Sequence, residues 1–101
     1  GRNVSPGWPE ALVLADPAIS HCAVLDGGAY PRAVIEPACL PESQARDLAA
    51  CCWAGLPDYA RPHDVTLVPP GAFHRSGWLR PDGSVNRRAV AAATACHDGQ
   101  T

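Results

Sequence analysis

Apolar residues along the chain fall into short β-branched runs and into longer segments with a helical period. Residues 19–25 and 30–36 are two such runs, and Asp26, Gly27 and Gly28 lie between them. Because glycine adopts the positive φ that tight turns need, the two runs predict an antiparallel hairpin. Residues 65–68 predict a short buried strand that ends at two prolines, which cannot donate to a sheet.

Three segments, residues 9–15, 41–55 and 87–96, predict helices. Pro9 suits a first helical turn, and Asp16-Pro17 ends that helix because the residue before proline avoids the helical conformation. The last segment consists largely of strong helix formers. The middle segment places five apolar residues on one face, namely Ala45, Leu48, Ala49, Cys52 and Trp53.

The order of these elements predicts a small single α+β domain over residues 1–101, with a short sheet that contains an antiparallel hairpin and about three packed helices. A net charge of −2 with scattered arginines gives no basic face, so we do not expect a nucleic-acid partner. No apolar run approaches the roughly 18–20 residues that span a bilayer, and no signal pattern opens the chain. We therefore expect a cytoplasmic protein without a membrane span.

The chain has five cysteines, an odd number with no CxxC pair. This spacing argues against a disulfide framework and a zinc knuckle, and we expect most of the cysteines to be small buried residues with free thiols. The dipeptides His21-Cys22 and Cys96-His97 contain metal-ligand types, but nothing in the sequence fixes their mutual distance. We expect no metal site.

Other patterns that carry chemistry are weak. His63-Asp64 and His74 could act as a base and its orienting carboxylate, yet no nucleophile is spaced to meet them. No serine lies in a Gly-x-Ser-x-Gly elbow, which excludes the usual hydrolase motif. No GxxxxGK or GxGxxG cradle is present, so the chain has no nucleotide site of its own.

The most specific segment is residues 77–90, GWLRPDGSVNRRAV. Pro81-Asp82-Gly83 predicts a tight turn, because proline fixes φ and glycine supplies a positive φ. We therefore expect residues 84–87 to leave a loop that projects from the domain and presents side chains.

This segment resembles the C-terminal signature of the AMP-forming acyl-CoA synthetases and adenylation domains, and it is most similar to the long-chain acyl-CoA synthetases. In that family a lysine follows the glycine that matches Gly83, and it acts while the acyl-adenylate forms. Here the matching position is Ser84, whose hydroxyl carries no charge. All eight basic residues are arginines, so Arg80 or Arg87 are the candidate substitute cations; the alternative is a solvated arginine pair at a helix start.

The first residues resemble the hinge loop of the same family, which enters the C-terminal subdomain and faces the pantetheine arm. The resemblance assigns Gly1, Asn3 and Pro6 to this surface that contacts CoA or pantetheine, whereas Pro9 stands where the family has an aliphatic residue. Residues 56–62, LPDYARP, are similar to the Leu-Pro-x-Tyr-x-x-Pro connector of the family.

The resemblance implies a mobile C-terminal subdomain of an ATP-dependent, AMP-forming acid–thiol ligase of fatty-acid metabolism, which closes over an acyl-adenylate and then admits CoA or a carrier-protein pantetheine. ATP and the acyl group would sit mainly on a large N-terminal adenylate-forming domain, in cis or in trans. ATP, Mg²⁺ and CoA are thus implied for the full enzyme, whereas this chain alone would carry no cofactor and no activity. The lack of methionine, even at position 1, suggests an excised domain. The alternative is a degenerate, non-catalytic subdomain that binds and regulates a partner ligase or carrier protein.

Overall fold

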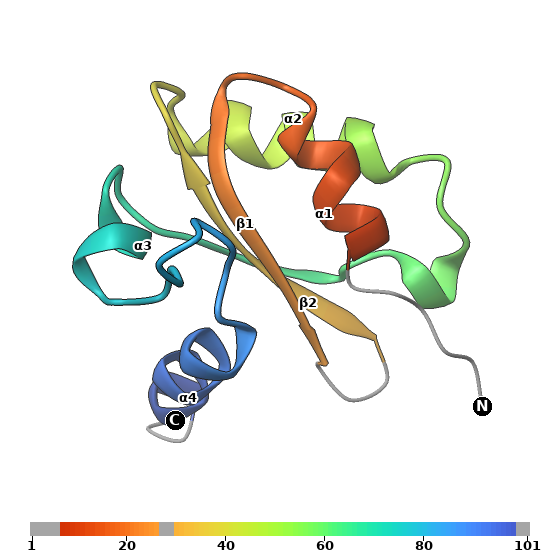
Figure 1. Ribbon diagram of the computed structural model, residues 1–101. Helices are drawn as coiled ribbons and strands as arrows, with labels where there is room; N and C mark the ends of the chain where they lie inside the picture. The colour runs from red at the N-terminus through yellow and green to blue at the C-terminus, as the bar shows by residue number, and fades with distance from the viewer. Residues whose placement is uncertain (1–6, 27–29, 99–101) are drawn as a thin grey trace.

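The computed structural model describes residues 7–26 and 30–98, and the chain forms a small α+β domain as predicted (Figure 1). The hinge-loop residues Gly1, Asn3 and Pro6 lie outside the described part. The elements are α1 (Gly7–Leu14), β1 (Ile19–Asp26), β2 (Pro31–Pro37), α2 (Glu42–Trp53), the 3₁₀ helix η1 (Asp58–Ala60), β3 (Asp64–Leu67), α3 (Ala72–Arg75) and α4 (Arg87–Asp98).

The three strands form one sheet in the order β1-β2-β3. β1 and β2 are antiparallel, with Ile19 opposite Pro37 and Asp26 opposite Pro31, so the predicted hairpin is confirmed. Its turn, residues 27–29, lies outside the described residues. β3 runs parallel to β2, because the α2 crossover returns the chain to the end of the sheet where β2 starts. β1 and β3 are therefore the edge strands of the described sheet. The strand predicted at residues 65–68 is present, but the prediction that it is buried is wrong, because as an edge strand β3 has only exposed and partly buried residues.

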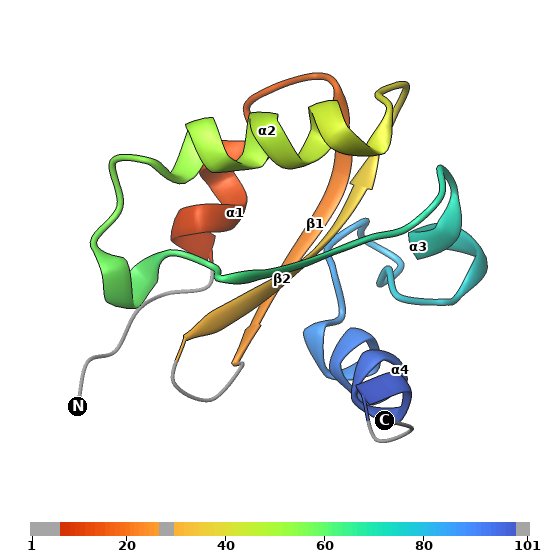
Figure 2. The same cartoon turned by 180° about the vertical axis from the view of Figure 1, so that it is seen from behind.

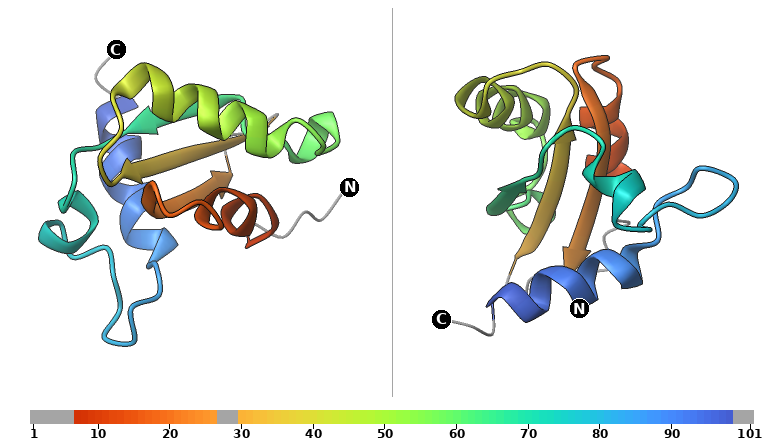
Figure 3. Two further views of the ribbon diagram at one scale, coloured as in Figure 1. Left: turned by 90° about the horizontal axis from the view of Figure 1, so that it is seen from above. Right: turned by 90° about the vertical axis from the view of Figure 1, so that its left-hand side faces the viewer.

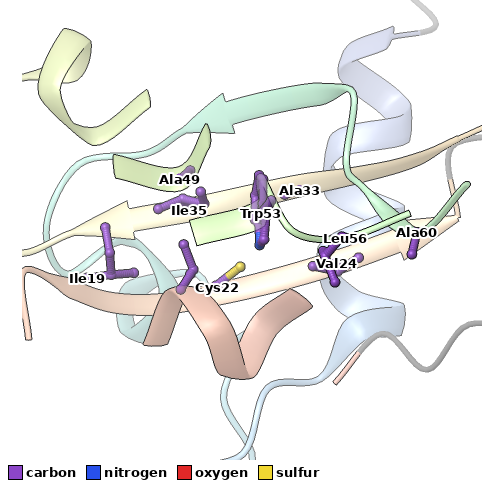
Figure 4. Close-up of a cluster of buried hydrophobic side chains, with 10 residues drawn as sticks. Ile19, Cys22, Val24, Ala33, Ile35, Ala49, Trp53, Leu56 and Ala60 are labelled. Carbon is purple, nitrogen blue, oxygen red and sulfur yellow. The ribbon is translucent and has the colours of Figure 1, made fainter. Parts of the chain in front are cut away.

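Helices cover both faces of the sheet (Figures 1 and 2). On one face, α1 and α2 enclose a core in which Trp53 lies among Ile35 of β2 and Cys22 of β1 (Figure 4). The predicted apolar face of α2 is confirmed, since Ala45, Ala49 and Trp53 are buried there. The buried members of this core are Val13, Ile19, Cys22, Val24, Ala33, Ile35, Ala49, Trp53, Leu56 and Ala60.

A second core lies on the opposite face, under α3 and α4 (Figure 3). Val34 of β2 packs there with Phe73 of α3 and Val90 of α4. Trp78 meets the Phe73 ring edge-on, with ring centroids 5.0 Å apart and an interplanar angle of 88°. Successive residues of β2 thus face two different cores, as the two-residue period of a strand requires.

Some predicted boundaries differ from the structure. α1 begins at Gly7, two residues earlier than predicted, and α2 ends at Trp53 rather than at residue 55. α3 was not predicted, because it is a single turn that starts after Gly71 at φ 86° and carries no apolar period of its own. None of the helices in the described residues is both long and apolar enough to cross a membrane.

The prediction that most cysteines are buried is wrong. Cys22 is buried, Cys52 is partly buried, and Cys39 and Cys51 are exposed; these four thiols are free. Cys51 is exposed because it lies on α2 beside, and not within, the face that carries Trp53. The side chain of Cys96 is outside the described part.

Candidate functional site at the projecting loop

The segment before α4 is a short hairpin that projects from the domain, as predicted (Figure 3). Leu79 and Val85 form an antiparallel bridge. The Arg80 amide donates to the Ser84 carbonyl oxygen over 2.7 Å, and the Gly83 amide donates to the Arg80 carbonyl oxygen over 2.8 Å. Gly83 has φ 91°, a conformation that a residue with a Cβ adopts only under strain, so glycine at this position closes the turn.

Ser84, at the position of the family lysine, is exposed at the end of this hairpin. Its backbone N–H and its hydroxyl both donate to Oδ1 of Asp82, over 3.0 and 2.7 Å. These two hydrogen bonds lower the pKa of the Asp82 carboxyl below its usual range, because they favour the ionised form. The tip therefore presents a hydroxyl beside a carboxylate.

Arg87, a predicted site residue, is paired with a residue of α1. Its Nε and Nη2 donate to Oε2 and Oε1 of Glu10 over 2.8 and 2.6 Å, a bidentate ion pair. The hydrogen bonds to Glu10 raise the pKa of Arg87. Glu10 is buried and also accepts from the Val24 amide of β1 over 2.7 Å. The carboxylate thus connects α1, the edge strand and the start of α4.

Sequence reasoning missed Glu10 as a partner, because the two residues lie 77 positions apart and no local pattern relates them. It also missed Asn86, whose Oδ1 accepts from the Ala89 amide over 3.2 Å and caps α4. An asparagine directly before a run of helix formers is the usual signal of such a cap.

Arg80 is the loop arginine whose guanidinium has no ion pair among the described residues, although its charge contributes to lowering the pKa of the nearby Asp82 carboxyl. It is exposed, and its guanidinium makes no hydrogen bond or ion pair with any residue that the structure describes. A cleft of about 470 Å³ opens between α1, β1 and the hairpin, and Arg80 lines it together with Leu14, His21 and Ser84. A cation at this place can meet an anionic ligand that approaches the loop.

The histidines considered from the sequence lie elsewhere. His63 is 3.4 Å from Asp58 Oδ1 and stacks on Tyr30, so its carboxylate partner is not its neighbour Asp64. His74 is exposed on α3. Within the described residues no group of three or more His, Cys, Asp or Glu side chains is placed to hold a metal.

Comparison with solved structures identifies the class of protein that has this fold. The chain superposes on the A-PCP didomain of carboxylic acid reductase from Segniliparus rugosus in complex with AMP, with a TM-score of 0.73 and 22% identity over 93% of this chain. It also matches anthranilate CoA ligase AuaEII in complex with anthranoyl-AMP (TM-score 0.67, 20% identity, 97% of this chain) and the Mycobacterium tuberculosis fatty acyl CoA synthetase (0.64, 20%, 96%).

The chain therefore has a fold that occurs in adenylate-forming enzymes, and the resemblance drawn from its motifs is confirmed at the level of the fold. It spans only 15%, 18% and 19% of the length of these three proteins. No protein-family model matches the sequence, and no curated protein matches it.

Proposed function

We propose that this chain is the mobile C-terminal subdomain of an ATP-dependent, AMP-forming acid–thiol ligase. It closes over an acyl-adenylate on a larger domain and then turns to admit CoA or a pantetheine arm, through a hinge surface at Gly1, Asn3 and Pro6. The observation that carries the proposal is the match of nearly the whole chain to a small part of several adenylate-forming enzymes. From the resemblance to long-chain acyl-CoA synthetases, we further propose that the protein acts in fatty-acid metabolism in the cytoplasm.

Within this function, Arg80 is the group that meets the anionic reactants. Arg87 is paired with Glu10, whereas the Arg80 guanidinium has no ion pair with any described residue, and Arg80 lies across the hairpin from Ser84. A guanidinium near a developing phosphate charge stabilises the transition state. Arg80 would therefore supply part of the charge that Ser84 does not carry.

ATP, Mg²⁺ and CoA are the cofactors of the proposed full-length enzyme. Arg80 and Ser84 suit contact with an acyl phosphate at the edge of a closed site, but they do not form a cradle for a triphosphate or a set of ligands for Mg²⁺. ATP would supply the activating AMP group, bound mainly to the larger domain. The part of this chain would be to orient the reacting groups and exclude water during closure.

The test uses the full-length protein, defined as the polypeptide encoded by the whole reading frame that contains this chain. We expect its sequence before Gly1 to encode an adenylate-forming domain, and the protein to catalyse ATP–pyrophosphate exchange with one member of a panel of aliphatic and aromatic carboxylic acids. It should also form a thioester from the preformed acyl-adenylate. Absence of such a domain both from this polypeptide and from a binding partner, or absence of both half-reactions with all of the acids, would overturn the proposal.

One observation favours a second function, that of a degenerate subdomain that binds and regulates a partner ligase or carrier protein. The loop tip carries the Asp82 carboxylate beside Ser84, where the catalytic reading requires a positive charge. Co-purification with a separate ligase or carrier protein, together with no exchange activity, would favour this second function.

A further inference from the structure

Glu10 is a buried carboxylate with three hydrogen bonds from two distant elements. Its side chain is 9% exposed, and it accepts from Arg87 Nε, Arg87 Nη2 and the Val24 amide. A buried charge is tolerated where it is paired and its oxygens are hydrogen-bonded, and Glu10 meets both conditions. We call these contacts of Glu10, Val24 and Arg87 the Glu10–Arg87 joint.

The joint stabilises one unfavourable feature of β1 and one of α4. β1 is an edge strand, and the Val24 amide points away from β2, so Glu10 gives this amide the partner that a further strand would give. Arg87 is the first residue of α4, where the positive end of the helix dipole disfavours a cation. The Glu10 carboxylate offsets that cost.

The projecting hairpin is consequently fixed at both of its ends. Trp78 before it is buried against Phe73 in the second core. Arg87 after it is held by Glu10, while Asn86 caps the helix between hairpin and joint. The residues between these two anchors, including Arg80 and Ser84, are exposed or partly buried.

We propose that Glu10 is a positioning residue, which holds Arg87 against β1 and so sets the direction in which the hairpin with Arg80 and Ser84 leaves the domain. Glu10 belongs to α1, the helix that follows the hinge-loop residues, so the same contact relates the hinge end of the chain to the loop. The consequence for catalysis rests on the proposed function; the joint itself does not.

Cys22 reports whether the joint is closed, without reference to any activity. It is fully buried in the adjoining core, and burial, followed by the charge of Glu10, raises the pKa of its thiol. The experiment labels the chain with N-ethylmaleimide and follows each cysteine by peptide mass spectrometry. We expect Glu10→Gln and Arg87→Gln each to speed labelling of Cys22 at least about tenfold, because the joint opens locally.

Comparison of these two variants separates local opening of the joint from a direct electrostatic effect on the Cys22 thiol. Loss of the Glu10 charge lowers the pKa of Cys22, whereas loss of the Arg87 charge raises it, so only opening speeds labelling in both. If Glu10→Gln alone speeds the labelling of Cys22, the proposal that the joint opens locally in both variants is overturned. As a matched control, Glu42→Gln makes the same change at an exposed pair with Arg46 and should leave labelling of Cys22 unchanged.

A second control addresses global stability. Leu56→Ala weakens the core that contains Cys22 without touching the joint. At conditions of equal unfolding free energy, this variant should label Cys22 more slowly than the two joint variants. Equal rates would mean that labelling follows global unfolding, and the proposal would fail.

In the full-length protein, Glu10→Gln should lower kcat for pyrophosphate exchange at least about fivefold and leave KM for ATP within about twofold, because misplacement of the loop affects the transition state of adenylation. Thioester formation from preformed acyl-adenylate should change less, and Glu10→Asp should restore part of the loss. Equal loss in both half-reactions, as expected from a smaller folded fraction, would overturn the positioning role. If the wild-type protein shows neither half-reaction, the proposed function fails, while the labelling of Cys22 still decides on the joint.

Discussion

Ser84 and Asp82 are joined twice, by the hydroxyl and the backbone N–H of the serine, to a single carboxylate oxygen of the aspartate. These bonds are local and do not reach the body of the domain, so they shape the tip without anchoring it. Opposite them, the Arg80 amide donates to the Ser84 carbonyl oxygen, which places the two residues across the hairpin from each other. A charge added at Ser84 would therefore lie close to both Asp82 and Arg80.

We predict that Ser84→Lys raises acyl-adenylate formation by the full-length protein at least about tenfold, because one preorganised cation at a developing charge contributes a factor of about 10² to 10³ in rate. Pyrophosphate exchange measures this step. Thioester formation from preformed acyl-adenylate should scarcely change, since the resemblance assigns that step to the hinge surface of the subdomain.

Substitutions of the arginines determine how the result for Ser84→Lys is interpreted. If Ser84→Lys has no effect while Arg80→Ala abolishes exchange, Arg80 already supplies the charge. Arg88→Ala, a neighbouring exposed arginine outside the joint, is the matched control and should retain exchange. If none of Ser84→Lys, Arg80→Ala and Arg87→Ala changes exchange, and the chain binds a separate ligase or carrier protein, the regulatory function replaces the catalytic one.

The sequence predicted the elements whose signals are local. The hairpin of β1 and β2 and the buried face of α2 follow from apolar spacing and turn residues within a few positions, and the structure confirms both. The contacts of Glu10 and Glu36 could not be predicted, because their partners lie 14 to 77 positions away in the chain. α3 was missed for a related reason, since an amide of this single turn is held by Glu36.

Glu36 should make stability depend on pH. Its Oε1 accepts from the Phe73 amide over 2.8 Å, and its Oε2 lies 3.3 Å from His21 Nδ1. Burial acts to raise the pKa of Glu36, but hydrogen bonds from the Phe73 and Gly71 amides and from His21 outweigh it, and the pKa is lowered. Because the pKa of Glu36 is lower in the folded state, its ionisation stabilises the fold at pH values above the pKa in the unfolded state, about 4.3. This contribution is lost as the pH falls through the pKa in the folded state.

We therefore expect the unfolding free energy, measured in urea from pH 7 to pH 3, to fall more steeply below about pH 5 in the wild type than in Glu36→Gln, which cannot titrate. Glu42→Gln removes an exposed carboxylate and should keep the wild-type slope. A Glu36→Gln curve parallel to that of the wild type would show that Glu36 does not carry this dependence.

The thiols should differ in reactivity according to their exposure. In unfolded protein a thiol assay should report all five cysteines, since their number and spacing favour free thiols. In folded protein Cys39 and Cys51 should react first, and Cys52 more slowly because partial burial raises the pKa of its thiol. A count of three or one in the unfolded state would indicate a disulfide.

Trp53 connects the two helices that cover the first core. Trp53 is the last residue of α2, and its side chain is fully buried. Its indole Nε1 donates to the Pro9 carbonyl oxygen of α1 over 2.9 Å. Trp53→Phe removes this hydrogen bond and part of the ring volume, and we expect it to lower the unfolding free energy by about 2 kcal/mol, from the lost bond and the cavity together. Chemical denaturation followed by far-ultraviolet circular dichroism measures the change without relying on the tryptophan signal.

Trp8→Phe makes the same chemical change at a ring that is 47% exposed on α1, and it should stay within about 0.5 kcal/mol of the wild type. Equal effects of the two substitutions would mean that the contact between Trp53 and Pro9 does not hold α1 to α2.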